Sequence, residues 1–369
     1  MAASHDIPLA HVTQKIDLLM DNLVTIQDTT GEFLLHLEDG RIIDTKGWAG
    51  WEWTHGVGLF GMWRYFEQTG DAKALGIIKG WFADRFAEGT PTKNINTMAP
   101  FLTLAWLYEH EPDPSYLPYL DIWAEWLMAP DGLPKTEEGG FQHIVYNDEN
   151  PGELWDDTLM MSVLPLAKIG LLLGRPHYVE EAKRQFLVHI KYLFDKKTGL
   201  WFHGWDFTGR HNFAEALWAR GNCWVTIAIP EIIEILDLAP GDAFREFLID
   251  TLAAQVKTLA ETQDESGLWH TLVIDPSSYL EASATAGFAY GILKAVRKGY
   301  LPRSYEGIGL KAVRGVLANV DDTGELQQVS FGTAMGDSLQ FYKDIRLTSM
   351  PYGQSLAICA LGELLRTYI

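Results

Sequence analysis

The sequence has few cysteines and few basic residues. Only Cys223 and Cys359 occur among its 369 residues, and they are too far apart to form a short metal-binding motif. They are also too few for the disulfide framework of a small secreted fold, so we expect a reducing compartment. The 29 Lys and Arg residues face 49 Asp and Glu residues, which gives a formal net charge of −20. This charge would repel a phosphate backbone or an anionic membrane, so we expect neither nucleic acid nor a membrane as a partner.

Long apolar runs are also missing. The N-terminal segment is interrupted by charged residues such as Asp6, Lys15 and Asp17, so we expect no signal peptide or membrane span there. No N-x-S/T acceptor occurs, and we expect a soluble cytoplasmic protein. Apolar residues make up 47% of the chain and are spread evenly, which favours one large core. We therefore expect residues 1–369 to form a single catalytic domain.

Hydrophobic periodicity predicts an all-α protein. Apolar residues recur at a period of 3.6 in twelve segments, and alternation at a period of 2 is rare. The predicted helices begin near residues 8, 55, 71, 96, 114, 154, 177, 216, 243, 279, 303 and 352. Segments with one apolar face, such as residues 243–261, alternate with segments that are apolar on nearly all sides, such as 224–236.

The connections between helices repeat as well. A Gly-Leu pair follows the amphipathic segments at Gly132, Gly199 and Gly267, with a looser version at Gly324, so the repeat is near 60 residues. Six helical hairpins of this kind predict an (α/α)6 barrel with inner and outer helix rings, and an open solenoid is the alternative. Closure is favoured because the last helix, 356–365, is as apolar as the internal ones and lacks the polar face of a capping repeat. The long loops would then gather at one end of the barrel and hold the site.

Two adjacent acids begin one of the buried helices. Asp156 and Asp157 lie between Trp155 and Met160. An acid at a helix N-terminus often caps free N–H groups, and we assign that role to one of the pair. The other, among apolar side chains and beside a second carboxyl, should resist ionisation and remain able to donate a proton.

Further polar and aromatic side chains fall in the same predicted loops. His203 and Arg220 come with several of the 14 tryptophans. The guanidinium fork matches a carboxylate and an indole face stacks on a sugar ring, so together they suit an acidic sugar. Weaker candidates are Trp48, Trp51, Trp53, His55, Gln142, His143, Trp269 and His270.

Several common catalytic motifs do not fit. The glycines of Gly56-Val57-Gly58-Leu59-Phe60-Gly61 match the dinucleotide fingerprint in letters, but no βαβ unit surrounds them. We expect these glycines to let an inner helix pack closely. No P-loop, HExxH or G-x-S-x-G motif occurs.

Five motifs resemble one enzyme family. They are W-x-D-T-L-x-M at 155–161, H-G-W-D at 203–206, W-A-R-G-N at 218–222, E-A-S-A-T-A-G-F-A-Y-G-I at 281–292 and Y-G-Q-S at 352–355. In order and spacing they resemble the unsaturated rhamnogalacturonyl hydrolases, glycoside hydrolase family 105, which are related to the unsaturated glucuronyl hydrolases. The resemblance covers essentially the whole chain and implies the same (α/α)6 barrel.

The resemblance also implies residue roles. It makes Asp157 the catalytic acid and places the substrate around His143, Trp155, His203, Trp218, Arg220 and Trp224, to which we add Trp53. It implies neither a metal nor a cofactor. One position departs from the family: Asn96 stands in a turn where many members have Asp. An amide there can bond a sugar hydroxyl but cannot take a proton as a carboxylate does.

The implied reaction is hydration of a vinyl ether. The family adds water across the 4,5 double bond of an unsaturated uronic acid at the non-reducing end of a small oligosaccharide, which releases the next sugar. One carboxyl can serve as acid and then as base in this reaction. Two alternatives remain: a sugar epimerase or isomerase on the same barrel, which would use a histidine pair, and a carbohydrate-binding protein without catalysis.

Overall fold

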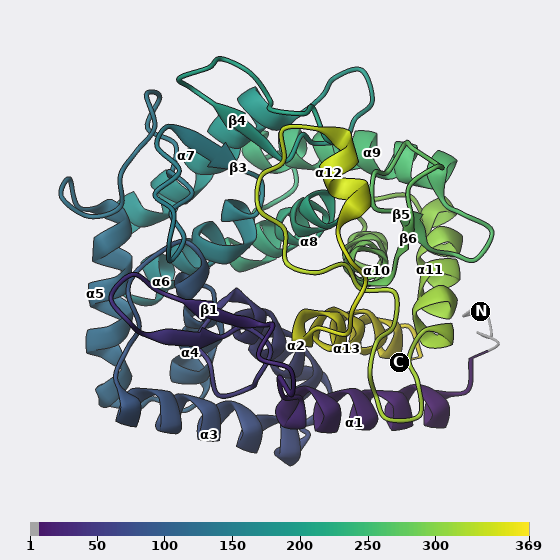
Figure 1. Ribbon diagram of the computed structural model, residues 1–369, viewed down its shortest axis with the longest axis horizontal. Coiled ribbons are helices and arrows are strands. Elements are labelled where there is room, and N and C mark those ends of the chain that lie inside the picture. Colours follow the sequence, from purple (N-terminus) through teal and green to yellow (C-terminus); the bar gives the residue numbers. More distant parts are fainter. Residues whose placement is uncertain (1–6, 369) are drawn as a thin grey trace.

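Six helices form an inner ring around the centre of the molecule. The computed structural model describes residues 7–368. The inner helices are α2 (Trp53–Thr69), α4 (Pro100–His110), α6 (Leu164–Leu172), α8 (Ala219–Ile235), α10 (Ala282–Arg297) and α13 (Pro351–Leu365). Each packs against the next, and α13 packs against α2, so the ring closes (Figure 1). The predicted (α/α)6 barrel is confirmed, and the open solenoid is wrong.

A second set of helices surrounds this ring. The outer helices are α1 (Leu9–Thr25), α3 (Ala72–Glu88), α5 (Leu117–Met128), α7 (Pro176–Leu193), α9 (Ala243–Thr262) and α11 (Glu306–Ala318). Each buries one face, as α9 does with Leu248, Leu252 and Val256. Asp71 and Asp242 accept backbone N–H groups at the starts of α3 and α9, which explains why these helices begin where the sequence predicted.

Short elements lie in the connections, and of these the sequence predicted only helix starts near residues 96, 114 and 303, which are 3-10 turns. They are the strand pairs β1 (Leu34–His36) with β2 (Ile42–Asp44), β3 (Glu153–Trp155) with β4 (Gly204–Asp206) and β5 (Trp269–His270) with β6 (Leu280–Glu281), the 3-10 turns η1 (Asn96–Met98), η2 (Pro114–Tyr116) and η4 (Arg303–Tyr305), the π-helical turn η3 (Leu159–Val163) and helix α12 (Leu339–Asp344). Strands of two or three residues are too short to show alternation. Because β3 precedes the inner helix expected near residue 154, helical structure there begins only at Leu159.

The Gly-Leu repeat marks the places where a connection crosses an outer helix. Gly267 and Gly324 both have positive φ. A Cβ on Gly267 would lie 2.3 Å from the Lys311 carbonyl oxygen of α11, and one on Gly324 would lie 2.2 Å from that of Leu18 in α1. Only glycine fits such close backbone approaches. The last turn of the repeat therefore packs on the first outer helix and helps to close the ring.

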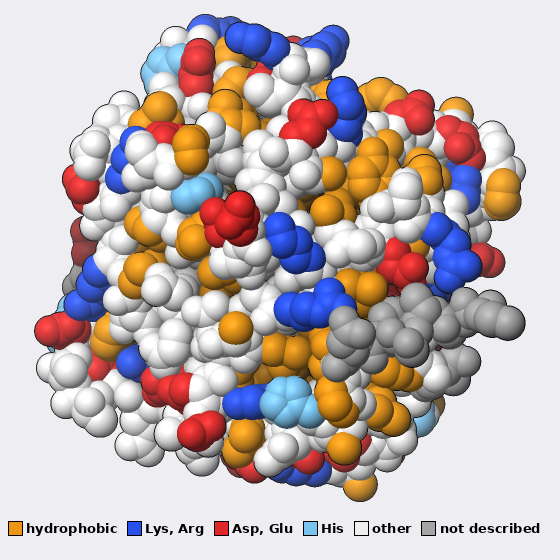
Figure 2. All heavy atoms as spheres, turned by 90° about the vertical axis from the view of Figure 1, so that its right-hand side faces the viewer, with side chains coloured by type: hydrophobic (Ala, Val, Ile, Leu, Met, Phe, Trp, Pro, Cys, Tyr) orange, Lys and Arg blue, Asp and Glu red, His pale blue; other side chains and the backbone are white. Residues whose placement is uncertain are grey.

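The glycine motif at 56–61 lies inside α2. A Cβ on Gly56 would lie 2.8 Å from the backbone carbonyl carbon of Ala99, and one on Gly61 would lie 3.0 Å from the carbonyl oxygen of Ser355 in α13. The expectation that these glycines serve helix packing is confirmed. None of the helices between residues 7 and 368 is long and apolar enough to cross a membrane. Acidic and basic side chains are interspersed on the face drawn in Figure 2, so the negative charge is not concentrated there.

Candidate active site

A pocket of about 450 Å³ opens where the inner helices begin. Glu52 and Trp53 at the start of α2, Asn96 in η1 and Arg220 at the start of α8 contribute from the barrel. The loops add Leu35, Thr45, His143, Val145, Tyr146, Asn147, Asp148, Asn150, Glu153, Trp155, Asp157, Phe213, Trp218, Gly332, Thr333, Ala334, Met335 and Asp337. The pocket lies at the loop-rich end, where the sequence predicted the site.

The β3–β4 pair brings Asp157 next to His203. Trp155 pairs with Gly204, and the Asp156 N–H donates to the His203 carbonyl oxygen at 3.1 Å. The chain then turns into η3, where the N–H groups of Met160 and Met161 donate to the Asp157 carbonyl oxygen. As a result the Asp157 Oδ2 and His203 Nε2 atoms lie 3.6 Å apart. Residues 46 positions apart in the chain thus share one wall of the pocket.

The two acids differ in burial and in protonation. The Asp156 side chain is fully buried, and neither carboxyl oxygen has a hydrogen-bond partner among the described residues. Burial, together with neighbouring Asp157, raises the pKa of the Asp156 carboxyl well above its usual value. Burial would also raise the pKa of Asp157, but the adjacent His203 outweighs it and holds that pKa below its usual value.

Two expectations about this pair are therefore wrong. The retained proton was predicted on Asp157, whereas Asp156 holds it, because burial and the neighbouring Asp157 carboxyl outweigh the stabilisation that nearby backbone N–H groups give to its charge. One acid was expected to cap the following helix, but no side chain caps the turn that begins at Leu159. The carboxyl of Asp157 faces the pocket, with 17% of its side chain exposed.

Aromatic rings surround these groups. The His143 ring stacks on Trp155 with centroids 4.2 Å apart and an interplanar angle of 8°, and the His203 ring lies 4.4 Å from that of Trp218. Burial lowers the pKa of His143 to about 3, so this imidazole is neutral near neutral pH. The His203 Nδ1 atom lies 2.7 Å from the Tyr342 hydroxyl, which fixes the orientation of the ring.

Arg220 holds the loop that forms one side of the pocket. Its two terminal nitrogens donate to the carbonyl and hydroxyl oxygens of Ser330, the carbonyl oxygen of Phe331 and the hydroxyl of Thr333. The guanidinium also lies over the rings of Trp218 and Tyr352 at 4.7 and 4.9 Å. Arg220 lines the pocket, as predicted, but most of its donors already serve the loop.

The remaining predicted residues fall in two groups. Trp53 lines the pocket and stacks on Tyr352 at 4.7 Å, and Asn96 lines the same wall. Trp224 is fully buried behind this wall, with its ring edge-on to Trp53 at 5.7 Å. His203 lies behind Asp157, with 1% of its side chain exposed.

The weaker candidates other than Trp53 and His143 serve the structure. The indole N–H groups of Trp51 and Trp269 donate to backbone carbonyl oxygens. The imidazole rings of His55 and His270 also lie within hydrogen-bonding distance of backbone carbonyl oxygens. Gln142 donates to the Glu149 carbonyl oxygen, and Trp48 borders a separate hollow beside α3.

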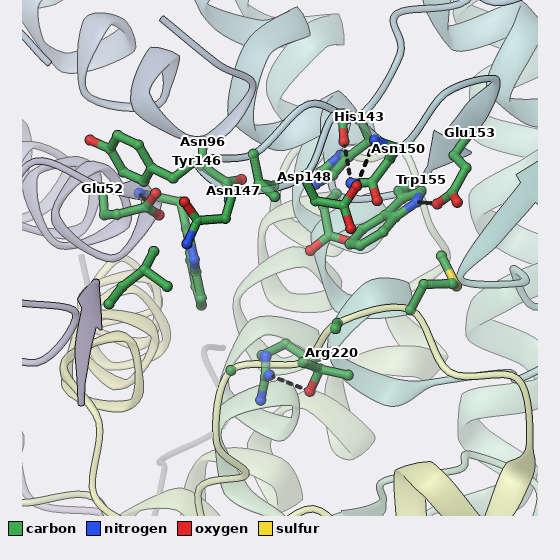
Figure 3. A pocket seen from close by; sticks show the side chains of 18 of the residues that line it. Glu52, Asn96, His143, Tyr146, Asn147, Asp148, Asn150, Glu153, Trp155 and Arg220 are labelled. Atoms are coloured by element: carbon green, nitrogen blue, oxygen red, sulfur yellow. Dashed lines mark hydrogen bonds between the residues drawn. The ribbon is translucent and has the colours of Figure 1, made fainter. Parts of the chain in front are cut away.

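Sequence reasoning missed part of the pocket wall. Glu52 stands between two tryptophans directly before α2, and that setting was the available signal. Tyr146, Asp148 and Asn150 come from the long loop before β3, where nothing in the pattern distinguishes a pocket residue from a surface residue. Figure 3 shows Glu52, Asn96 and Tyr146 on one side of the pocket and His143, Trp155 and Glu153 on the other.

One cluster in this site has the composition of a cation site. Asp156, Asp157 and His203 can each offer one ligand atom, and these atoms lie within 4.8 Å of one another. The sequence-based expectation of a reaction without metal stays a prediction, which a chelator can test.

Comparisons with known proteins agree with this geometry. The sequence profile of Glycosyl Hydrolase Family 88 matches residues 25–368. The unsaturated rhamnogalacturonyl hydrolase YesR of Bacillus subtilis (strain 168) is 32% identical over 321 residues, which are 86% of this chain and 90% of that protein.

Solved structures give the same result. A crystal structure described as a possible member of the GH105 family from Salmonella enterica serovar Paratyphi A is 60% identical, with a TM-score of 0.98, over 100% of this chain and 97% of that chain. The unsaturated glucuronyl hydrolase of Bacillus sp. GL1 shares the fold, with a TM-score of 0.69 at 17% identity over 96% of each chain. The chain therefore belongs to glycosyl hydrolase family 88 and is a glycoside hydrolase, which confirms the resemblance that its motifs indicated.

Proposed function

We propose that this enzyme adds water across the 4,5 double bond of an unsaturated uronic acid at the non-reducing end of a short oligosaccharide and releases the next sugar. The observation that carries the proposal is the position of Asp157. Its carboxyl faces a pocket walled by Trp53, Trp155 and Trp218, with His203 at 3.6 Å. The names of the relatives favour an unsaturated galacturonyl-rhamnose type of substrate.

In the proposed reaction Asp157 gives a proton to C4. This step leaves oxocarbenium character at C5, and water attacks C5 while the Asp157 carboxylate takes one of its protons. The product is a hemiketal, which opens to a ketone at C5, and the hydroxyl thereby formed at C1 expels the next sugar. One carboxyl acts as acid and then as base, so the reaction needs no second carboxylate at a glycosidase spacing.

The first step requires a proton on a group that is ionised in the free site. An incoming uronate adds negative charge and excludes water, and both effects raise the pKa of Asp157. Asp156, which retains its proton, offers a source, and its carboxyl lies within 4.8 Å of that of Asp157. The pair of acids with their histidine is therefore proposed to work as one titrating unit.

Other side chains are proposed to bind and orient the sugar. The indoles of Trp155 and Trp218 offer apolar faces to the ring, and the stacked His143 supports the first of them. Arg220 would contribute its positive charge toward the uronate while its hydrogen bonds keep residues 330–333 in place. His203 would orient the Asp157 carboxyl toward the reacting carbon and water, and such positioning can account for several kcal/mol of the barrier.

The biological setting follows from the substrate. We propose that the whole chain acts as a single catalytic domain on short products of pectin-type lyases, imported into the cytoplasm. The two cysteines are both buried and unpaired, which supports a reducing compartment.

The test is turnover of a lyase-generated unsaturated disaccharide. The wild-type enzyme should abolish the ultraviolet absorbance of the double bond and release the free second sugar. Unchanged absorbance together with an isomerised product would favour an epimerase instead.

A further inference from the structure

Glu52 is a buried acid in the pocket wall that the proposed mechanism leaves unused. It is the residue directly before α2, and 6% of its surface is exposed. Its Oε2 accepts the N–H of Trp53 at 3.0 Å, and its own backbone N–H donates to His55 Nδ1 at 3.0 Å. The first contact holds the carboxyl and the second holds the backbone, so that Glu52 lines the pocket together with Asn96 (Figure 3).

No cation stabilises this carboxyl. Among the described residues none forms an ion pair with Glu52, unlike the buried Glu231, which meets Arg64 and Lys294. Burial raises the pKa of the Glu52 carboxyl to about 7, and the Trp53 N–H only partly counteracts this. A short polar residue would cap α2 at a smaller desolvation cost, as Asp71 caps α3.

The titratable groups around Glu52 are uncharged near neutral pH. Burial lowers the pKa of His55, on the same helix, to about 4, and burial also raises the pKa of Tyr146, from the facing loop, above its usual value. Asn96, in η1, and Thr45, directly after β2, have no titratable side chain. The charged groups that share the pocket with Glu52 are Arg220, Asp148, Glu153, Asp157 and Asp337.

We propose that Glu52, in its protonated form, is a substrate-binding residue that donates a hydrogen bond to a ring hydroxyl of the unsaturated uronic acid, next to the amide of Asn96. The inference rests on the proposed function. A neutral acid offers one donor and one acceptor, which suits a hydroxyl group. An ionised Glu52 would instead add a negative charge to a small pocket that must accept a uronate, and binding would weaken.

The experiment compares pH profiles of wild type and Glu52→Gln with the unsaturated disaccharide. Glutamine keeps the acceptor for Trp53 and a donor toward the sugar but cannot ionise. In wild type, KM should rise about tenfold per pH unit above pH 7 while kcat changes little, because the neutral fraction of Glu52 falls tenfold per unit. In Glu52→Gln, KM should match the wild-type value at pH 6 within about threefold and lack this rise.

Two further variants control for folding and position. Glu52→Asp keeps the acid but shortens its reach, so it should raise KM at every pH. Asp242→Ala removes a cap at the start of α9, away from the pocket, and should leave the KM profile of wild type unchanged.

The outcomes separate this inference from the proposed function. Turnover by wild type with superimposable KM profiles for wild type and Glu52→Gln would overturn the role of Glu52 alone. A loss confined to kcat in Glu52→Gln would do the same. Failure of wild type to turn over the disaccharide at any pH would overturn the proposed function and this inference with it.

Discussion

Glu231, at one end of the barrel, is buried in a different way from Asp156 and Glu52 at the other end. At the C-terminal ends of the inner helices, Glu231 is fully buried but contacts Arg64, Lys294 and the hydroxyl of Tyr290. Burial alone would raise the pKa of Glu231, but these cations hold it below its usual value. At the N-terminal ends, Asp156 and Glu52 are buried without a cation, and burial raises the pKa of both.

The difference separates acids that tie helices together from acids that carry protons. The carboxyl of Glu231 is neutralised by Arg64 and Lys294, and these ion pairs join α8 to α2 and α10 in the inner ring. The unpaired acids cost stability at neutral pH, but they keep protons available beside the sugar. Removing single groups from each end tests this distinction.

The largest expected effect is on catalysis at the open end. Asp157→Asn should lower kcat by about 10³-fold or more, because the amide can neither give nor take the proton. The loss of ultraviolet absorbance in a lyase-generated disaccharide measures this rate. Calorimetric titration should still detect binding, and turnover near the wild-type rate would contradict the assignment of Asp157.

The next effect is on stability at the paired end. Glu231→Gln removes the negative charge that Lys294 and Arg64 share, so two buried cations are left close together. The free energy of unfolding should fall by about 3 kcal/mol. Urea unfolding measures the change. The kcat of the folded enzyme should remain that of wild type, and a selective loss of kcat without destabilisation would argue against a purely structural role.

A smaller effect is expected where Arg220 holds the pocket loop. Arg220→Lys cannot reproduce the four contacts to residues 330–333 and should raise KM about tenfold, with a smaller change in kcat. Steady-state kinetics separates the two constants. An unchanged KM would show that these contacts to the loop do not contribute to binding.

The unpaired acid beside the catalytic residue should affect the pH dependence of stability. The folded-state pKa of Asp156 is raised, so its stabilising contribution is complete below the unfolded pKa near 4 and is lost as pH rises toward the folded pKa. Over that window wild type should lose up to about 1.4 kcal/mol per pH unit from this group. Asp156→Asn should remove this part of the slope in unfolding experiments between pH 5 and 7, and an unaltered slope would contradict a protonated Asp156.

The smallest expected effect is that of metal removal. If the Asp156, Asp157 and His203 cluster works through protons alone, dialysis against a chelator should leave kcat and KM unchanged. Loss of activity that a divalent cation restores would assign the cluster a metal.

The sequence was sufficient for the rings of the barrel but not for its site chemistry. Period 3.6 located α9 and its buried leucines because an outer helix has one wet face, and the Gly-Leu turns marked the repeat. The motifs also brought Trp155, Asp157 and Trp218 to one pocket. The proton on Asp156 could not be foreseen, because it depends on which of two adjacent carboxyls meets His203, and only the β3–β4 pairing decides that. Glu52 was missed because a capping position looks the same in sequence whether or not it borders a cavity.

Closure of the ring by α13 has a consequence for how the protein is made. The apolar face of α2 awaits a partner near the other end of the chain, and Gln354 reaches Asn22 across 332 residues. A nascent chain on the ribosome therefore exposes that face until translation is almost complete. Such long-range pairing slows folding and leaves the incomplete chain prone to aggregation, so we expect this enzyme to depend on chaperones more than a protein built from local contacts.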